Sequence, residues 1–188
     1  VLFKRGGSWT GKLNITSSGV SGNSILIGAY GSGSAPAISA GSSCVMLAGS
    51  YLVLQDLQMS GCTWAGIEVG GKHNLVRRNV VTGNVVGVSV RSGAYANRVI
   101  GNIIKDNNIM SELTEGGSDD NGAFGVLLKG DRTEISSNTI SGSDAFSYDY
   151  GRDGAAIEVY GGRKNHIHHN LAMNNDAFSE LGNPRSAD

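Results

Sequence analysis

Residues 79–105 read NVVTGNVVGVSVRSGAYANRVIGNIIK, and this stretch decides the fold. It begins with Asn79-Val80-Val81-Thr82 and ends with Asn102-Ile103-Ile104-Lys105, so a polar residue followed by a short strand recurs after 23 residues. The block also begins 23 residues earlier at Asp56, and later copies begin at Asn138 and Asn170, at spacings of 36 and 32 residues. A fixed internal period of this kind is typical of solenoids. We therefore predict a coil of about 23 residues, lengthened by about 13 and then about 9 residues in its last two copies.

A second short block precedes these strands, and every second residue in it is apolar. A four-residue strand cannot bury its apolar face alone, so equivalent strands must stack on it. A third short strand lies between the two blocks, at 74–76 and again at 165–167. No window sustains the apolar stripe of a helix. The sequence thus predicts an all-β, three-sided solenoid over residues 1–188 as a single domain, with a core that includes Ile67, Val69, Val88, Val90, Val126, Leu128, Ile157 and Val159.

The composition fits such a chain and excludes several classes of protein. Apolar residues make up 39% and charged residues 16%, which indicates a globular domain. The 29 glycines against two prolines indicate many tight turns. The net charge of −1, without a basic run, argues against a nucleic-acid partner. No stretch approaches the roughly 20 apolar residues of a membrane-spanning helix.

The asparagines that open the strands have a structural explanation. A polar side chain at the same corner of successive coils can donate and accept along the stack, which satisfies turn backbone that is otherwise buried unpaired. We therefore expect Asn79, Asn102, Asn138 and Asn170 to form an inward-facing ladder and to have no catalytic role.

The two cysteines and the chain ends give further expectations. Cys44 and Cys62 do not have metal-site spacing, and we expect two buried thiols in preference to a disulfide. The chain opens at Val1 as if within a strand and stops after residues 184–188 without a capping pattern. We therefore expect the domain to be part of a longer chain.

The opening residues carry a family resemblance. Residues 1–9, VLFKRGGSW, followed by residues 25–31, ILIGAYG, resemble the early coils of many secreted bacterial proteins of the pectin-lyase-like superfamily. The resemblance implies a right-handed parallel β-helix. It also implies a polysaccharide lyase, a glycoside hydrolase, a uronate epimerase or a non-catalytic adhesin or tailspike. The chain lacks the paired arginines of pectate lyases and the Gly-His-Gly and Arg-Ile-Lys motifs of polygalacturonases, although Asp119-Asp120 is similar to the aspartate pair of the latter.

Two insertions mark the place where chemistry is expected. Residues 108–121 are acidic, and residues 143–153 combine acidic and aromatic side chains. Both follow an asparagine-led strand, so in a stacked solenoid they leave from the same corner of neighbouring coils. We expect them to form the walls of a groove.

The strand register places two glutamates beside that groove. Glu158 and Glu180 fall at equivalent outward positions of successive coils, and strands in a ladder lie roughly 4.8 Å apart. Such a pair suits a retaining glycosidase, in which one carboxyl group attacks and the other protonates the leaving group. It also suits Ca²⁺, which prefers oxygen ligands. An ordinary solvated pair is the third alternative.

The next outward column offers a second chemistry. It contains Arg91, Lys129 and Tyr160. A lyase removes the proton next to a uronate carboxylate, and Lys129 or Tyr160 can act as the base. We expect Glu158, Glu180, Lys129 and Tyr160 to be catalytic; the residues expected to contact substrate are Arg91, Tyr150, Arg152 and Asp153.

Other candidates have weaker support. His166 and His168 share one face of a strand on another side of the coil, and with His169 they lack the converging ligands of a zinc site. Trp9, Trp64, Tyr148 and Tyr150 can stack on sugar rings or fill turns.

The sequence therefore predicts an extracellular enzyme that cleaves or modifies a polysaccharide or oligosaccharide, by hydrolysis or by β-elimination, in a groove on the β-helix. The alternative is a non-catalytic carbohydrate-binding or surface-attachment protein. No cofactor is required by either, although the glutamate pair permits Ca²⁺.

Overall fold

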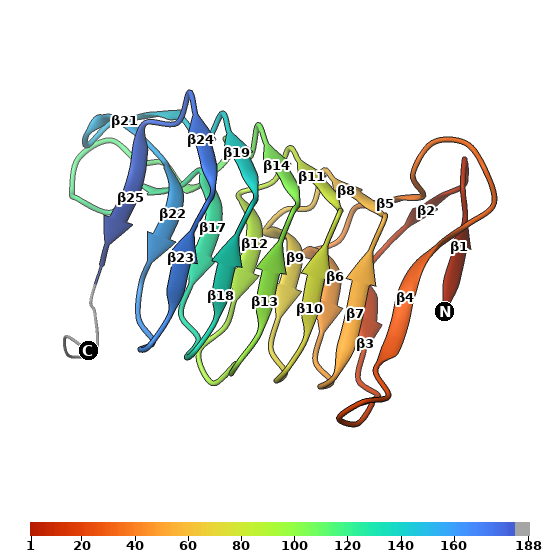
Figure 1. The fold of residues 1–188 in the computed structure, drawn as a ribbon. Helices are drawn as coiled ribbons and strands as arrows, with labels where there is room; N and C mark the ends of the chain where they lie inside the picture. Colours follow the sequence, from red (N-terminus) through yellow and green to blue (C-terminus); the bar gives the residue numbers. More distant parts are fainter. Residues whose placement is uncertain (183–188) are drawn as a thin grey trace.

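A computed structural model describes residues 1–182, so the residues 184–188 on which the expected truncated end rests lie outside the described chain. Within residues 1–182 all regular structure is β, and no helix is present that could span a membrane. The chain winds into three parallel sheets of seven strands each, stacked coil upon coil (Figure 1). The prediction of a three-sided, right-handed parallel β-helix is confirmed.

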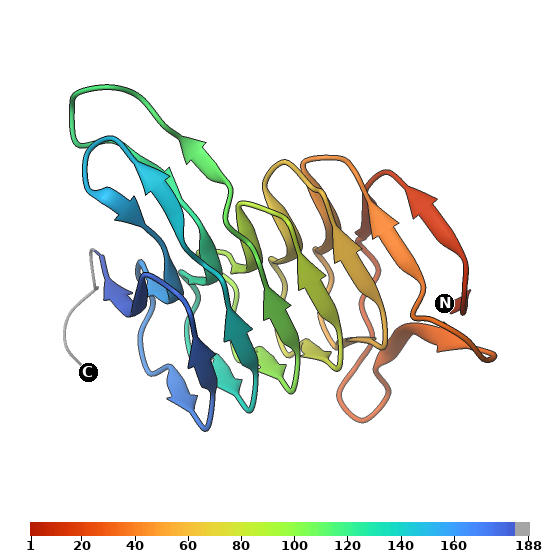
Figure 2. The same cartoon turned by 90° about the horizontal axis from the view of Figure 1, so that it is seen from above.

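Each sheet takes one strand from each coil, as the view from above also shows (Figure 2). The first sheet contains β1 (Leu2–Lys4), β4 (Ile25–Tyr30), β7 (Leu52–Gln55), β10 (Leu75–Arg77), β13 (Arg98–Ile100), β18 (Glu134–Ser136) and β23 (His166–His168). The second contains β2 (Ser8–Thr10), β5 (Ala37–Ser39), β8 (Gln58–Ser60), β11 (Val80–Thr82), β14 (Ile103–Lys105), β19 (Thr139–Ser141) and β24 (Leu171–Met173). The third contains β3 (Leu13–Ile15), β6 (Ser43–Leu47), β9 (Ala65–Val69), β12 (Val86–Val90), β17 (Phe124–Leu128), β22 (Ala155–Val159) and β25 (Ala177–Leu181).

The core lies inside the solenoid, between the three sheets. Ile67, Val88, Val126 and Ile157 are stacked partners in the third sheet and are fully buried, as the alternating pattern predicts. They pack with inward residues of the other two sheets in one continuous apolar cluster. Burial of this continuous core supplies the main driving force for stacking.

The repeat alignment is wrong by one residue in its first copy. Val80 pairs with Gln58, so Leu57 and not Asp56 is the equivalent of Asn79. Asp56 instead occupies the turn position of Arg78, and both residues have a positive φ. The two side chains form an ion pair at 2.8 Å on the outside of the corner. The sequence alignment of the repeats is off by one residue here because the turn position next to the ladder position is also polar.

Asparagines at the corners are bonded along the stack. Asn79 Nδ2 donates to Asn102 Oδ1, Asn102 Nδ2 donates to Asn138 Oδ1, and Asn138 Nδ2 donates to Asn170 Oδ1, at 2.9–3.1 Å. Each amide nitrogen also donates to a backbone carbonyl of a preceding coil, for example Asn102 Nδ2 to Val76 at 3.0 Å. These bonds satisfy the turn backbone that each coil buries.

The other two corners are built in the same way, which the sequence analysis did not anticipate. Asn84 Nδ2 donates to Asn107 Oδ1 at 2.9 Å at the corner that enters the third sheet. At the corner that enters the first sheet, the backbone N–H of Asn74 donates to Asn97 Oδ1 at 2.9 Å. All three corners of the solenoid therefore contain side-chain amides that bond between coils, in addition to the sheet hydrogen bonds.

The expectation of two free thiols is wrong. Cys44 and Cys62 form a disulfide with a Cα–Cα distance of 5.7 Å, which lies in the usual range. In the next coil the equivalent corner brings Gly66 against Asn84, with only 3.0 Å between a Cβ built on Gly66 and Asn84 Nδ2. The cysteine pair thus replaces the glycine–asparagine contact of this corner. The disulfide could not be predicted from the sequence, because it depends on the geometry of the corner and not on the spacing of the two cysteines.

Loss of this disulfide should lower stability substantially. The bond closes a loop with a sequence separation of 18, and its removal should reduce the free energy of unfolding by about 3 kcal/mol. Urea unfolding of the oxidised protein, and of protein unfolded and refolded in reductant, measures the difference. A Cys44→Ser, Cys62→Ser variant is the control, and its free energy of unfolding should be the same with and without reductant. Equal free energies of unfolding in both states would contradict the prediction.

Candidate functional site

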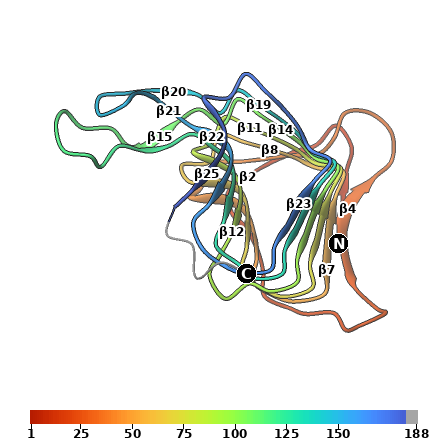
Figure 3. The same cartoon turned by 60° about the vertical axis from the view of Figure 1, so that its left-hand side comes forward.

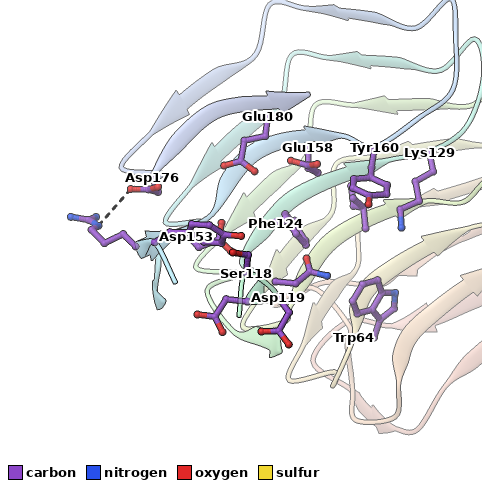
Figure 4. Close-up of a pocket in the computed structure, with 15 residues that line it drawn as sticks. Trp64, Ser118, Asp119, Phe124, Lys129, Asp153, Glu158, Tyr160, Asp176 and Glu180 are labelled. Atoms are coloured by element: carbon purple, nitrogen blue, oxygen red, sulfur yellow. Dashed lines mark ion pairs between the residues drawn. The ribbon is translucent and has the colours of Figure 1, made fainter. Parts of the chain in front are cut away.

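An open groove lies on the outer face of the third sheet. It has a volume of about 820 Å³. Its floor comes from outward side chains of β17, β22 and β25 and of the residues that follow these strands (Figure 4). The residues that line it are Trp64, Ser118, Asp119, Asp120, Asn121, Phe124, Leu127, Lys129, Tyr150, Arg152, Asp153, Glu158, Tyr160, Asp176 and Glu180.

Two hairpins form the wall of the groove, as the insertions predict. β15 (Met110–Glu112) pairs with β16 (Asn121–Gly122), and β20 (Ala145–Ser147) pairs with β21 (Gly151–Asp153), each in antiparallel fashion. Both project from the corner between the second and third sheets (Figure 3). Residues from both loops line the groove, so the two insertions and the sheet together make one site.

The hairpins are held together by two aspartates. Asp120 Oδ2 accepts hydrogen bonds from Ser147 Oγ at 2.7 Å and from the backbone N–H of Asp149 at 3.1 Å. Asp149 Oδ2 accepts the backbone N–H groups of Asp119 and Asp120 at 2.7 and 3.0 Å. Burial opposes ionisation of Asp120, but its hydrogen bonds outweigh it and leave its pKa below the ordinary value. Asp119-Asp120, which resembles a catalytic aspartate pair in sequence, therefore includes a structural clamp.

The same three aspartates form a compact acidic group. Among residues 1–182, Asp119, Asp120 and Asp149 each offer an oxygen within 4.8 Å of the others, which is close enough to share a cation. Several of these oxygens already accept hydrogen bonds from the clamp. The geometry accounts for the group without a metal.

Glu158 and Glu180 lie side by side at the groove (Figure 4). They are paired residues on adjacent strands, β22 and β25, as the register predicts. Glu158 is only 5% exposed, and its Oε2 has no hydrogen-bond partner among the described residues. Burial, and then the neighbouring carboxyl group of Glu180 through hydrogen bonding and charge, raise the pKa of Glu158 to about 7. Glu158 can therefore donate a proton, or a hydrogen bond, near neutral pH.

Asp153 adds a third carboxyl group to this pair. It ends the second hairpin and lines the same groove. Burial, followed by the negative charge of Glu180, raises the pKa of Asp153 to about 6. The close packing of Asp153, Glu158 and Glu180 keeps protons on the cluster in a pH range where isolated carboxyl groups are ionised.

Lys129 and Tyr160 lie beside the glutamates, on adjacent coils. Lys129 Nζ is 4.9 Å from the centroid of the Tyr160 ring, and the Tyr160 side chain is about half exposed. Gly182 makes this packing possible, because a Cβ there would lie 2.6 Å from Tyr160 Cδ2 and 2.9 Å from Glu158 Oε1. The sequence analysis did not identify Gly182 as part of the site, since only its position over the groove gives it that role.

The residues expected to contact substrate fall into two groups. Tyr150, Arg152 and Asp153 line the groove. Arg152 forms ion pairs with Asp144 and, at 3.7 Å, with Asp176, a lining residue that the sequence analysis missed. Arg91 does not line the groove; its guanidinium lies 3.6 Å from Glu68. It shares the column of Lys129, but it is not part of the groove lining, although Trp64 of the preceding coil is.

The remaining candidates lie apart from the groove, except for one tryptophan. Trp64 lines it, whereas Trp9 packs edge-on against Phe3 in the first coil. The histidines lie on or beside β23 in the first sheet, where His168 Nε2 is 3.5 Å from Glu134. Among residues 1–182 they do not belong to a group of three metal ligands.

Comparison with known proteins adds to this geometry. No family model matches the sequence, and no curated protein matches it. Among solved structures, an alginate lyase from Paenibacillus sp. str. FPU-7 superimposes with a TM-score of 0.69. The two sequences are 18% identical, and the alignment covers 91% of this chain and 68% of the lyase chain, so the likeness establishes the fold alone.

The raised pKa of Glu158 gives a test in stability. Because the folded chain binds this proton more tightly than the unfolded chain, the free energy of unfolding should fall as the pH rises from 4.5 to about 7. Glu158→Gln mimics the protonated side chain, so it should be more stable than the wild type by about 3 kcal/mol at pH values above this window. Below the window the difference should be much smaller. Urea unfolding across pH measures it, and a difference that does not change with pH would contradict the assignment.

Proposed function

We propose that this protein cleaves a uronate-containing polysaccharide in the groove by β-elimination. The observation that carries the proposal is the cluster formed by Lys129, Tyr160 and Glu158 on one face of the sheet. It combines groups that can move a proton with a carboxyl group that retains its own proton near neutral pH. The alginate lyase that shares this fold supports the same class of reaction.

The reaction needs two kinds of assistance from these side chains. The proton on the sugar carbon next to the carboxylate must be made more acidic, and a base must remove it. Glu158 lines the groove, and in its protonated form its carboxyl group can donate a hydrogen bond to the substrate carboxylate. A carboxylic acid kept neutral by its surroundings is a known donor of this kind.

Lys129 and Tyr160 supply the proton transfers. One of them accepts the carbon-bound proton, the electron pair forms a carbon–carbon double bond, and the bond to the glycosidic oxygen breaks. The leaving oxygen takes a proton from the other side chain or from water. Lys129 and Tyr160 follow adjacent strands and are neighbours, so both can reach one side of the same sugar. This arrangement suits removal of the proton and departure of the oxygen on one face.

The glutamate pair favours one second candidate, hydrolysis. Glu158 and Glu180 are paired across strands that lie roughly 4.8 Å apart, near the spacing of about 5–5.5 Å between the carboxyl groups of retaining glycosidases. The raised pKa of Glu158 would suit the acid, and Glu180 would be the nucleophile. Most of the charged side chains that line the groove are acidic, so a hydrolase with this groove would favour a neutral polysaccharide.

An assay against a panel of polysaccharides tests the proposal and separates the candidates. Uronate polymers and neutral polymers are incubated with the protein, with and without Ca²⁺, and both the ultraviolet absorbance of unsaturated ends and the number of reducing ends are followed. Elimination should raise both signals together on a uronate polymer. Reducing ends without absorbance would instead support hydrolysis, and retention of polymer without any product would support a non-catalytic binding protein.

The proposed setting is extracellular. The disulfide between Cys44 and Cys62 supports it, because such bonds form and persist in oxidising compartments. An extracellular polysaccharide is also a substrate too large to enter a cell intact.

A further inference from the structure

The second hairpin carries an exposed aromatic cluster. Phe146, Tyr148 and Tyr150 are 59%, 50% and 57% exposed, and the rings of Phe146 and Tyr148 meet edge to face at 4.9 Å. Large aromatic side chains exposed together on one loop mark a binding surface more often than isolated ones do. The catalytic cluster does not use Phe146 or Tyr148.

The hairpin that carries these rings is held in place. Ser147, between Phe146 and Tyr148, is buried and donates to Asp120 of the first hairpin. Its Oγ also accepts the backbone N–H of Tyr150 at 3.1 Å. Successive side chains of a strand point to opposite faces. Ser147 therefore points to the neighbouring hairpin, while the rings of Phe146 and Tyr148 on either side of it stay exposed. A surface fixed in advance loses little conformational freedom when it binds.

The aromatic cluster is continuous with the groove. Phe146 is the cross-strand partner of Arg152, and residues directly opposite in an antiparallel pair point to the same face. Arg152 and Tyr150 both line the groove. A chain that occupies the groove and leaves it past the second hairpin would therefore meet Phe146 and Tyr148.

We infer that Phe146 and Tyr148 form a sugar-binding platform that holds the polysaccharide outside the cleavage site. A pyranose ring presents an apolar face of C–H groups, which packs on an aromatic ring, while its hydroxyl groups stay in water. The inference rests on the proposed function and extends it: the protein binds long chains more tightly than short oligosaccharides. A protein partner or a second copy of the chain is the competing occupant.

A double variant, Phe146→Ser with Tyr148→Ser, tests the platform. Both rings are exposed, so the fold should be unaffected. For the long polymer, KM should rise by about tenfold, as expected for the loss of one well-stacked ring or two weaker ones. For a short oligosaccharide that fills only the groove, KM and kcat should not change. Tyr30→Ala is the matched control, because Tyr30 is 50% exposed on β4, outside the groove lining.

Direct binding distinguishes failure of the platform from failure of the proposed function. Retardation of the protein in a gel that contains the polymer measures binding without any need for cleavage. Retardation that is lost in the double variant supports the platform even if no product forms. Equal retardation of wild type and double variant, or equal KM for long and short substrates, overturns it. A wild-type dimer that becomes a monomer in the double variant also overturns it, since the rings then serve self-association.

Discussion

Tyr160→Phe and Lys129→Met should each lower kcat on the uronate polymer by about 100- to 10,000-fold, the usual loss for a group that transfers a proton. Tyr160→Phe removes only the hydroxyl group and keeps the ring that contacts Lys129. Lys129→Met keeps much of the length of the side chain and removes its ability to accept or donate a proton. KM should change much less than kcat, because the walls and floor of the groove remain.

The matched control for these variants lies in the same column. Arg91→Met removes a cation from the equivalent outward position of the coil that precedes Lys129, outside the groove lining. It should leave kcat unchanged. Melting temperatures close to that of the wild type would show that the folds are intact. Full kcat in both Tyr160→Phe and Lys129→Met would contradict their assignment to proton transfer.

Asn102→Ala should destabilise the protein by about 3–6 kcal/mol. Asn102 is 1% exposed and accepts hydrogen bonds from both the backbone N–H and the Nδ2 of Asn79. It also donates to the carbonyl of Val76. Its removal takes away hydrogen bonds to the backbone N–H and Nδ2 of Asn79 and to the carbonyl of Val76, and each buried polar group that is left unsatisfied costs about 1–3 kcal/mol.

Urea unfolding of Asn102→Ala measures this effect. Asn108→Ala is the control, because Asn108 lies six residues further along the chain and is exposed. Its free energy of unfolding should stay within about 0.5 kcal/mol of the wild type, as for ordinary surface substitutions. If Asn102→Ala were as stable as Asn108→Ala, the ladder would not be a source of stability.

The parts of the structure that follow from stacking could be predicted from the sequence. In-register parallel strands repeat the same residue position in every coil, so the core at Ile67 and Val88 and the adjacency of Glu158 and Glu180 both follow from spacing. The adjacency of Lys129 and Tyr160 follows from their spacing in the same way. The error at Asp56 arose because this polar turn residue directly precedes the ladder position, which Leu57 occupies in this coil.

Features that depend on loops or corners could not be predicted in this way. The clamp between Asp120 and Ser147 joins two insertions whose shapes have no repeat to fix them. The disulfide depends on the contact across one corner of the coil. Arg91 has the correct column, but it lies outside the groove lining, and its guanidinium is close to Glu68 instead. The sequence can therefore give the position along the solenoid more reliably than the extent of the site.

The central claim is that the groove cleaves its polysaccharide by elimination and without the addition of water. Digestion in water labelled with heavy oxygen, followed by mass spectrometry of the products, tests this directly. Elimination should give unlabelled oligosaccharides with an unsaturated end. Their mass should be that of the corresponding hydrolytic product less one water. Products that carry one heavy oxygen atom at the new reducing end would contradict the account and assign the reaction to Glu158 and Glu180 as a hydrolytic pair.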